Sequence, residues 1–176
     1  DKLELTIMSQ EQNAILAKQS FNEDVLLSDQ TLTLEKFVVD FSSLLVGEIT
    51  TLKLTFQSQR IITKSDSIFF RIPLDFEILT PMECLIVGST ITLSCSINQG
   101  SQTIILDKFS EDLLDSEYTL TLSSIRNPLN NTKSSFYFLM EVVNSNNVTS
   151  SFGTYYKQTS FLCGNNCKYC QDISTK

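Results

Sequence analysis

The 176-residue sequence contains no histidine and no tryptophan, and only five glycines and three prolines. Histidine is the side chain that most often acts as a general base near neutral pH and as a metal ligand. Its absence excludes Ser-His-Asp and Cys-His catalytic sites and HExxH zinc sites within this sequence. We therefore expect a protein that is not an enzyme and that holds no metal or cofactor.

Long apolar runs and basic clusters are missing as well. No stretch of about eighteen apolar residues occurs, so no segment is predicted to cross a membrane as a helix. Thirteen basic and twenty acidic residues give a net charge of −7. Without a stripe of lysine and arginine, nucleic acid and anionic membrane surfaces are poor candidate partners. A hydrophobic share of 41% is typical of a folded domain.

Apolar and polar residues alternate along most of the chain, as they do in β-strands with one buried face. Leu52, Leu54 and Phe56 give one example. Residues 67–72 and 136–143 are apolar on both faces, which predicts central strands. Glycine- and asparagine-containing turn signals separate the strands at the spacing of a sandwich. We predict an all-β fold, a two-layer antiparallel Ig-like β-sandwich with a short disulfide-rich C-terminal tail.

Three segments follow from this pattern. Residues 31–161 carry about nine predicted strands and form the sandwich. Residues 1–30 comprise an N-terminal strand and a polar tether, and residues 162–176 begin a cysteine-rich module. Helix signals are few, and residues 9–17 and 108–115 are interpreted as turn or linker rather than as one or two helical turns.

One strand changes the parity of its apolar face. Leu32 and Leu34 are followed by Phe37, Val39 and Phe41, so an extra residue separates the two apolar series. A β-bulge near Lys36 would return the second series to the buried face, and we predict one there.

The N-terminal strand has two interpretations. Leu3, Leu5 and Ile7 alternate with polar residues, and the polar stretch Ser9–Gln30 separates them from the sandwich. The strand is either the first strand of the same sandwich or an assembly strand donated to the edge of the next subunit.

Two of the five cysteines, Cys84 and Cys95, lie eleven positions apart across a Gly88-Ser89 turn. A hairpin between them would bring the two within reach of a disulfide. Because nothing nearby would depress a thiol pKa, we predict a structural disulfide rather than a redox pair.

The other three cysteines, Cys163, Cys167 and Cys170, crowd the tail. They are interpreted as disulfide partners within the tail, beyond Lys176 or in a neighbouring chain. A zinc site is the alternative, but it needs four ligands. The tail ends soon after its third cysteine, so we expect the chain to be a piece of a larger secreted or surface protein.

Two further motifs suggest sites. Asn130 and Asn147 each begin an Asn-x-Thr sequence, the acceptor of N-linked glycans. An acidic cluster is interpreted as a solvated loop, with Ca²⁺ binding as the alternative because calcium takes oxygen ligands. The cluster comprises Asp107, Glu111, Asp112, Asp115 and Glu117.

Several short motifs resemble a known class of module. They are Gly47-Glu48 with the strand that follows, Ile68–Pro73 with Phe76, the Cys84 and Cys95 pair, Ile125–Pro128, and the strand Ser135–Val143. They are similar to β-sandwich modules of very large surface proteins of single-celled eukaryotes such as ciliates. In those proteins the modules lie beside furin-receptor-like cysteine-rich repeats, which Cys163–Cys170 also resembles. The resemblance covers residues 44–176 and implies an extracellular, repetitive and non-enzymatic role.

We therefore expect a structural building block of an extracellular filament or cell-surface coat. Its partners would be copies of itself, joined by strand or edge contacts, together with N-linked glycans. The alternative is an adhesin or ligand-binding module, which needs an exposed acidic or aromatic site. The acidic cluster, Tyr155 and Tyr156 are the candidates for that site.

Overall fold

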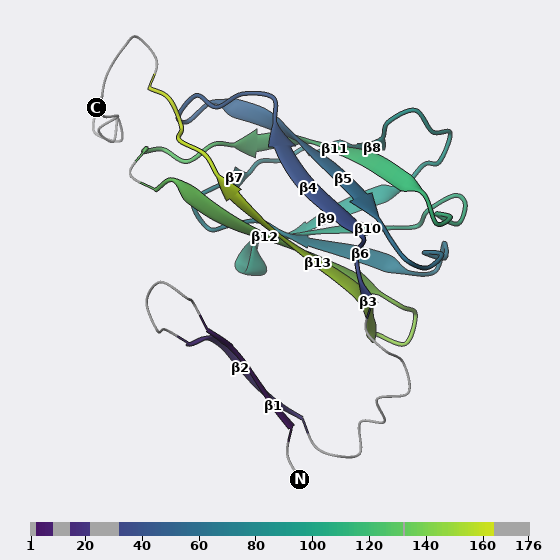
Figure 1. Cartoon of the computed structure of the whole chain (residues 1–176). Helices are drawn as coiled ribbons and strands as arrows, with labels where there is room; N and C mark the ends of the chain where they lie inside the picture. The colour runs from purple at the N-terminus through teal and green to yellow at the C-terminus, as the bar shows by residue number, and fades with distance from the viewer. Residues whose placement is uncertain (1–2, 9–14, 22–31, 132, 164–176) are drawn as a thin grey trace. The chain divides into compact units, whose positions relative to one another are not determined.

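A computed structural model describes residues 3–8, 15–21, 32–131 and 133–163 (Figure 1). The chain divides into two compact units, residues 1–30 and residues 31–176. In the part of the chain that is described, no helix has the length and apolar character needed to cross a membrane.

The first unit contains a β-hairpin. Strand β1 (Leu3–Met8) pairs antiparallel with β2 (Ile15–Phe21), from Leu3 opposite Phe21 to Met8 opposite Ile15. The sequence left open whether β1 is a strand of the sandwich or a donated strand; in the structure its strand partner is β2. Residues 15–21, expected to be part of a polar tether, form that partner strand. A lone strand leaves its backbone N–H and C=O groups without partners, and a second strand nearby in the sequence supplies them.

The second unit is a two-layer β-sandwich, as the sequence predicts (Figure 1). Neighbouring strands are antiparallel except β3 and β13, which are parallel. The first sheet has the order β3 (Leu32–Thr33), β13 (Thr149–Gln158), β12 (Ser135–Val143), β6 (Ser67–Arg71), β10 (Thr103–Asp107) and β9 (Ser94–Asn98). The second has the order β4 (Lys36–Phe41), β5 (Ile49–Gln57), β11 (Glu117–Arg126) and β7 (Glu77–Ile78), with β8 (Cys84–Ile86) also paired to β11.

Alternating side chains of the two sheets fill the space between them. On β5, Leu52, Leu54 and Phe56 are buried while Lys53 is exposed. Strands β6 and β12, predicted to be central from their apolar faces, do lie in the interior of the first sheet. Burying a large apolar side chain contributes about 1.5–3 kcal/mol before the cost of ordering it.

Phenylalanine rings concentrate the core at one end of the sandwich. Phe41 of β4 stacks on Phe76 at 5.7 Å between ring centroids, and Phe76 contacts Phe138 of β12. Phe161, which follows β13, meets Phe136 edge-on at 5.4 Å. Edge-on and offset pairs suit the quadrupoles of aromatic rings, so this cluster joins both sheets and the start of the tail.

The chain crosses between the sheets at Leu34 and Glu35. The Leu34 N–H donates to Phe152 O of the first sheet at 2.8 Å, and the Glu35 N–H donates to Gln57 O of the second at 2.9 Å. The predicted bulge near Lys36 was wrong, since β4 pairs with β5 in unbroken register. Changing sheets also reverses which side of the strand is inward, which accounts for the altered parity.

Close packing makes this crossing possible. A Cβ atom on Gly153 of β13 would lie 2.7 Å from Leu34 Cδ1. Only glycine lets the side chain of the crossing segment lie directly on the β13 backbone.

Turns elsewhere follow the sequence signals. Gly47 and Gly88 have φ of +69° and +73°, a conformation that favours glycine. A 3₁₀ turn spans Gln99–Ser101, and Asn98 caps it by accepting the Ser101 N–H. No α-helix occurs among the described residues, which agrees with the weak helix signals.

Asn127, which directly follows β11, holds the connection between β4 and β5 in place by hydrogen bonds. It is 1% exposed, and its Nδ2 donates to the carbonyl oxygens of Ser43 at 3.0 Å and Leu45 at 2.8 Å. Its own N–H donates to Glu48 O. These bonds add to the isolated parallel bridge of the same segment, in which the Leu162 N–H donates to Leu44 O and Leu162 O accepts the Val46 N–H.

Candidate functional site at the sheet edges

The acidic cluster does not form one site. Among residues that the structure describes, no three Cys, Asp or Glu side chains are grouped so as to hold a metal ion. Asp112 accepts the Lys64 N–H at 2.7 Å, and Glu117 pairs with Lys36 Nζ at 2.6 Å. These carboxylates therefore serve separate local contacts.

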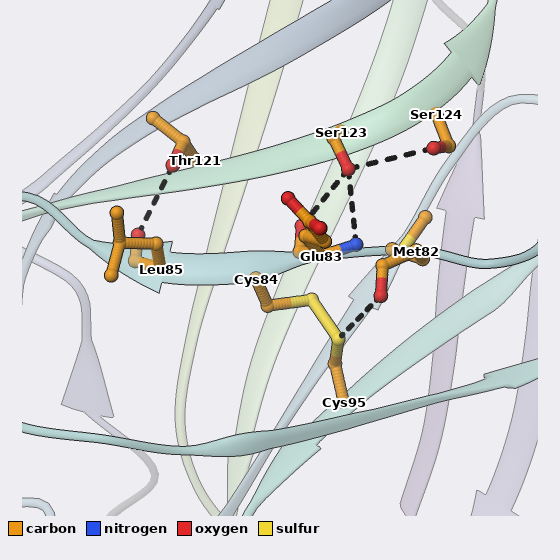
Figure 2. Close-up of a disulfide and its surroundings, with 8 residues drawn as sticks. All are labelled: Met82, Glu83, Cys84, Leu85, Cys95, Thr121, Ser123 and Ser124. Atoms are coloured by element: carbon orange, nitrogen blue, oxygen red, sulfur yellow. Dashed lines mark hydrogen bonds between the residues drawn. A yellow bond between two sulfur atoms is a disulfide. The ribbon is translucent and has the colours of Figure 1, made fainter.

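Cys84 and Cys95 form a disulfide with a Cα–Cα distance of 6.2 Å (Figure 2). The expected hairpin between them was wrong, because β8 belongs to the second sheet and β9 to the first. The disulfide therefore connects the two layers of the sandwich at one side. Alternation predicts that Cys95 faces inward, but it does not say which sheet carries each cysteine.

A bulge in β11 positions the β8 side of this disulfide. The β11–β5 register shifts between Leu122 and Ile125. Here the Ser123 N–H donates to Glu83 O at 3.0 Å. Ser123 Oγ also accepts the Glu83 N–H at 3.0 Å and donates to Glu83 O at 3.4 Å, the two contacts drawn in Figure 2. β-Bulges often occur where a strand must change direction or end a pairing. This one fixes the segment immediately before Cys84.

On the other side of the disulfide, β9 ends the first sheet with a strand neighbour on one side only. Its sequence, Ser-Cys-Ser-Ile-Asn, contains no charged residue and no proline. Ser94, Ser96 and Asn98 are exposed, whereas Cys95 and Ile97 are half-buried. β9 thus carries neither of the two residue types that usually protect an edge strand.

The opposite side of the sandwich is charged. β4 ends the second sheet and exposes Lys36 and Asp40. On β13, beyond its short contact with β3, Lys157 lies inward and its Nζ is 2.7 Å from Asp40 Oδ1. Exposed charges and an inward-pointing lysine are established ways of blocking the addition of another strand.

The outer face of the first sheet carries two exposed tyrosines. Tyr137 of β12 and Tyr156 of β13 are opposite each other and are 58% and 55% exposed. Tyr155, considered with Tyr156 as a possible binding residue, instead packs edge-on against Phe37 at 6.2 Å. Only Tyr156 of that pair is exposed.

Beside Tyr137 the sheet surface is hollowed. A pocket of about 400 Å³ is lined by Arg71, Leu74, Gln102, Tyr137 and Leu139, among others. The buried Gln102 Oε1 has no hydrogen-bond partner within the described residues. Most of the lining is apolar, so the pocket offers few groups that would select a ligand.

Both glycosylation motifs lie in connections between strands. Asn130 is exposed between β11 and β12, and Asn147 is exposed in the turn between β12 and β13. Asn147 adopts a φ of 60°, and Asn144 Oδ1 accepts the N–H groups of Asn146 and Val148 in the same turn.

The remaining expected sites lie at the ends of the chain. Cys163 is disulfide-bonded, whereas Cys167 and Cys170 lie outside the described residues. Leu3, Leu5 and Ile7 fall on β1, where the structure describes the backbone only. Sequence reasoning missed Lys157 and Ser96. No signal in the sequence identifies them, because the sequence does not show which strands lie at the edge of a sheet.

Comparisons with known proteins give no family. No family model and no curated protein matches the sequence. Among solved structures, a cohesin module from a Clostridium perfringens family 33 glycoside hydrolase matches with a TM-score of 0.46 and 9% identity. The match covers 70% of this chain and 94% of that one.

Two other solved structures are also similar to this chain. BslA, a bacterial hydrophobin, has a TM-score of 0.46 and 15% identity, over 74% of this chain and 98% of its own. A collagen-binding domain from a Staphylococcus aureus adhesin has a TM-score of 0.41 and 6% identity, over 70% and 97%.

Proposed function

We propose that the chain is a non-enzymatic building block of an extracellular filament or cell-surface coat, and that its copies associate through strand edges. The observation that supports this most is the set of open edges. In the described sandwich, β4, β9 and the Gly153–Gln158 part of β13 each have a strand neighbour on one side only. Unpaired backbone groups along an edge are a ready template for another chain.

The extracellular part of the proposal rests on the cysteines and the glycosylation motifs. The Cys84–Cys95 disulfide joins the sheets, and Cys163 is also disulfide-bonded. Structural disulfides persist in oxidising compartments and are rare in the cytosol. Exposure of Asn130 and Asn147 in connections suits acceptors of N-linked glycans.

β1 remains the proposed assembly strand. Its pairing with β2 means that a donated strand brings a hairpin with it, so the acceptor would gain two strands rather than one. A two-stranded hairpin is marginally stable in water, and addition to a larger sheet would stabilise it.

Electron microscopy of the full chain at high concentration, and of native material, tests the proposal. Ordered filaments or sheets of repeating particles are the expected result. Dispersed single particles under all conditions would contradict it.

A binding module is the second candidate function, and the exposed Tyr137 and Tyr156 favour it. Tyrosine supplies contact area at low entropic cost and is common at binding surfaces. A glycan array probed with the full chain and with a Tyr137→Ser, Tyr156→Ser variant tests this candidate. Binding that the variant loses would support it, and the absence of binding by either protein would remove its main support.

A further inference from the structure

We propose that β9 is the edge through which two copies join, by pairing with β9 of a second copy in antiparallel orientation about Ser96. This inference rests on the proposed function, because it names the edge that self-association uses. Three features of β9 support the inference: its composition, the direction of its free backbone groups, and the disulfide that fixes it to the other sheet.

The first observation is the difference between the two sides of the sandwich. The side formed by β4 and β13 carries Lys36, Asp40 and Lys157, and the last two form an ion pair between the sheets. β7 pairs over two residues only, and its Glu77 binds Arg126. β9 has none of these protections. An unprotected edge strand can pair with other chains and aggregate, so we expect one to be kept where a specific partner covers it.

The second observation is which backbone groups of β9 are free. The Ile72 N–H donates to Gln102 O, so Gln102 directs its backbone toward β6. Hydrogen-bonding direction alternates along an antiparallel strand, so Thr103 and Ile105 direct theirs toward β9. Their partners are Asn98 and Ser96.

It follows that Cys95 and Ile97 direct their N–H and C=O groups away from the sheet. In a two-fold pairing about Ser96, Cys95 of one copy is opposite Ile97 of the other. These two residues can then exchange N–H···O bonds with each other, and the symmetry-related pair, Ile97 of the first copy and Cys95 of the second, can do the same. The free groups of β9 are therefore complementary to themselves, as a closed two-fold interface requires.

Charge also favours a second copy as the occupant. The chain has a net charge of −7, so most of its surface repels another copy. Pairing β9 with itself places Ser96 opposite Ser96 and Ser94 opposite Asn98, and no like charges meet within the strands. Exposed Leu85 and Val87, on and beside β8, add apolar surface on the same side.

The disulfide gives this edge a fixed shape. Cys95 lies at the second position of β9 and is bonded to Cys84 of β8 in the other sheet. An edge strand fixed in this way loses little conformational freedom on pairing, which lowers the entropic cost of association. The result would be a continuous sheet that runs through both copies.

A charge placed on the symmetry axis tests the proposal. Ser96→Lys alters an exposed side chain and brings two lysines directly opposite each other in a dimer. Thr154→Lys is the matched control, because Thr154 is an exposed strand residue on β13. Sedimentation of the full chain should show dimers for the wild type and the control, and at least a tenfold higher dissociation constant for Ser96→Lys, with unchanged circular dichroism and melting temperature.

A second variant, Ser96→Cys, tests the same pairing by cross-linking and does not depend on whether Ser96→Lys folds. Cα atoms of a directly opposed, non-hydrogen-bonded pair are about 4.5 Å apart, within the range of a disulfide. Ser96→Cys should therefore give a covalent dimer whose non-reducing peptide map contains a link between the two introduced cysteines.

The outcomes separate the inference from the proposed function. If wild type and Ser96→Lys associate equally and the introduced cysteines do not link, β9 is not the junction, and self-association must use another edge. If Thr154→Lys alone is monomeric, the junction is β13 and the inference fails. If the wild type itself stays monomeric, the proposed function fails.

Discussion

At the scale of single residues, buried hydrogen bonds decide where the irregular segments lie. Asn127 donates to Ser43 O and Leu45 O from a buried position. These carbonyl groups belong to a segment whose path no hydrophobic pattern specifies. A buried amide that bonds two carbonyls substitutes for a strand partner.

Asn127→Ala should therefore destabilise the sandwich by about 1–3 kcal/mol, because it removes two buried hydrogen bonds and leaves only the longer contacts of Thr50 Oγ1 to Ser43 O, at 3.4 Å, and of the Glu48 N–H to Leu45 O, at 3.3 Å. Urea unfolding followed by circular dichroism measures this. Asn146→Ala, at an exposed turn, is the control and should change stability by less than about 0.5 kcal/mol. Equal effects of the two substitutions would contradict the role given to Asn127.

Gly153 is required by packing rather than by backbone angle. Its Cβ position is 2.7 Å from Leu34 Cδ1, and Leu34 Cβ and Cγ are each 3.2 Å away. Gly153→Ala should cost about 1–3 kcal/mol, because the crossing segment must shift. At Gly100 an added Cβ meets only ordinary contact, at 3.5 Å from Asn98 Oδ1. Thermal unfolding of Gly153→Ala and Gly100→Ala should thus differ clearly, and a similar loss in both would count against the close approach.

At the scale of elements, the disulfide joins β8 and β9, which lie in different sheets and therefore do not pair with each other by backbone hydrogen bonds. Replacing both cysteines by alanine should lower the free energy of unfolding by about 3 kcal/mol, from the entropy of closing a short loop. Denaturant unfolding measures the loss, and a non-reducing peptide map of the wild type verifies the link. Full stability in the double variant would mean that the sheets hold this edge without it.

The N-terminal hairpin should be dispensable for folding. Deleting residues 1–8 removes β1, which pairs only with β2 in the described backbone. We expect an unchanged melting temperature for the sandwich and assemblies that stop at dimers, because the proposed β9 junction is retained. Calorimetry and light scattering test the two parts. An unfolded product would place β1 within the folding unit of the sandwich.

Most strands of the sandwich could be predicted from the sequence, whereas β2 was missed and the sheet to which each strand belongs could not be predicted. Alternation at Leu52, Leu54 and Phe56 reports which side of a strand is buried. The crossing at Leu34 and the placement of Cys84 depend on backbone partners far away in the sequence. Inward-facing residues look alike in either sheet, so a change of sheet was interpreted as a bulge, and a link between sheets as a hairpin.

The candidate site could be predicted even less. The disulfide pair was identifiable from spacing, because a short loop between two strands brings cysteines together in several topologies. The uncharged edge was not identifiable, since an edge strand differs from a central one only in its neighbours. The absence of charge at Ser94–Asn98 indicates an unprotected edge only once β9 is known to lie at the end of a sheet.

At the scale of the whole molecule, the two sides of the sandwich differ in a way that suits directed assembly. The β4 and β13 side is protected by Lys36, Asp40 and Lys157, whereas the β8 and β9 side is uncharged within its strands and fixed by a disulfide. A net charge of −7 opposes contact elsewhere on the surface. An uncharged edge strand on one side and charged edge strands on the other limit how copies can meet.

The most direct test is sedimentation equilibrium of the full chain over a wide concentration range, without reductant. Non-reducing denaturing gels of the same samples separate covalent links of the tail from contacts between folded copies. The account predicts a mass that rises above the monomer with concentration and returns to it in denaturant. A single monomer mass at every concentration would contradict self-association and leave the binding module as the better explanation of this fold.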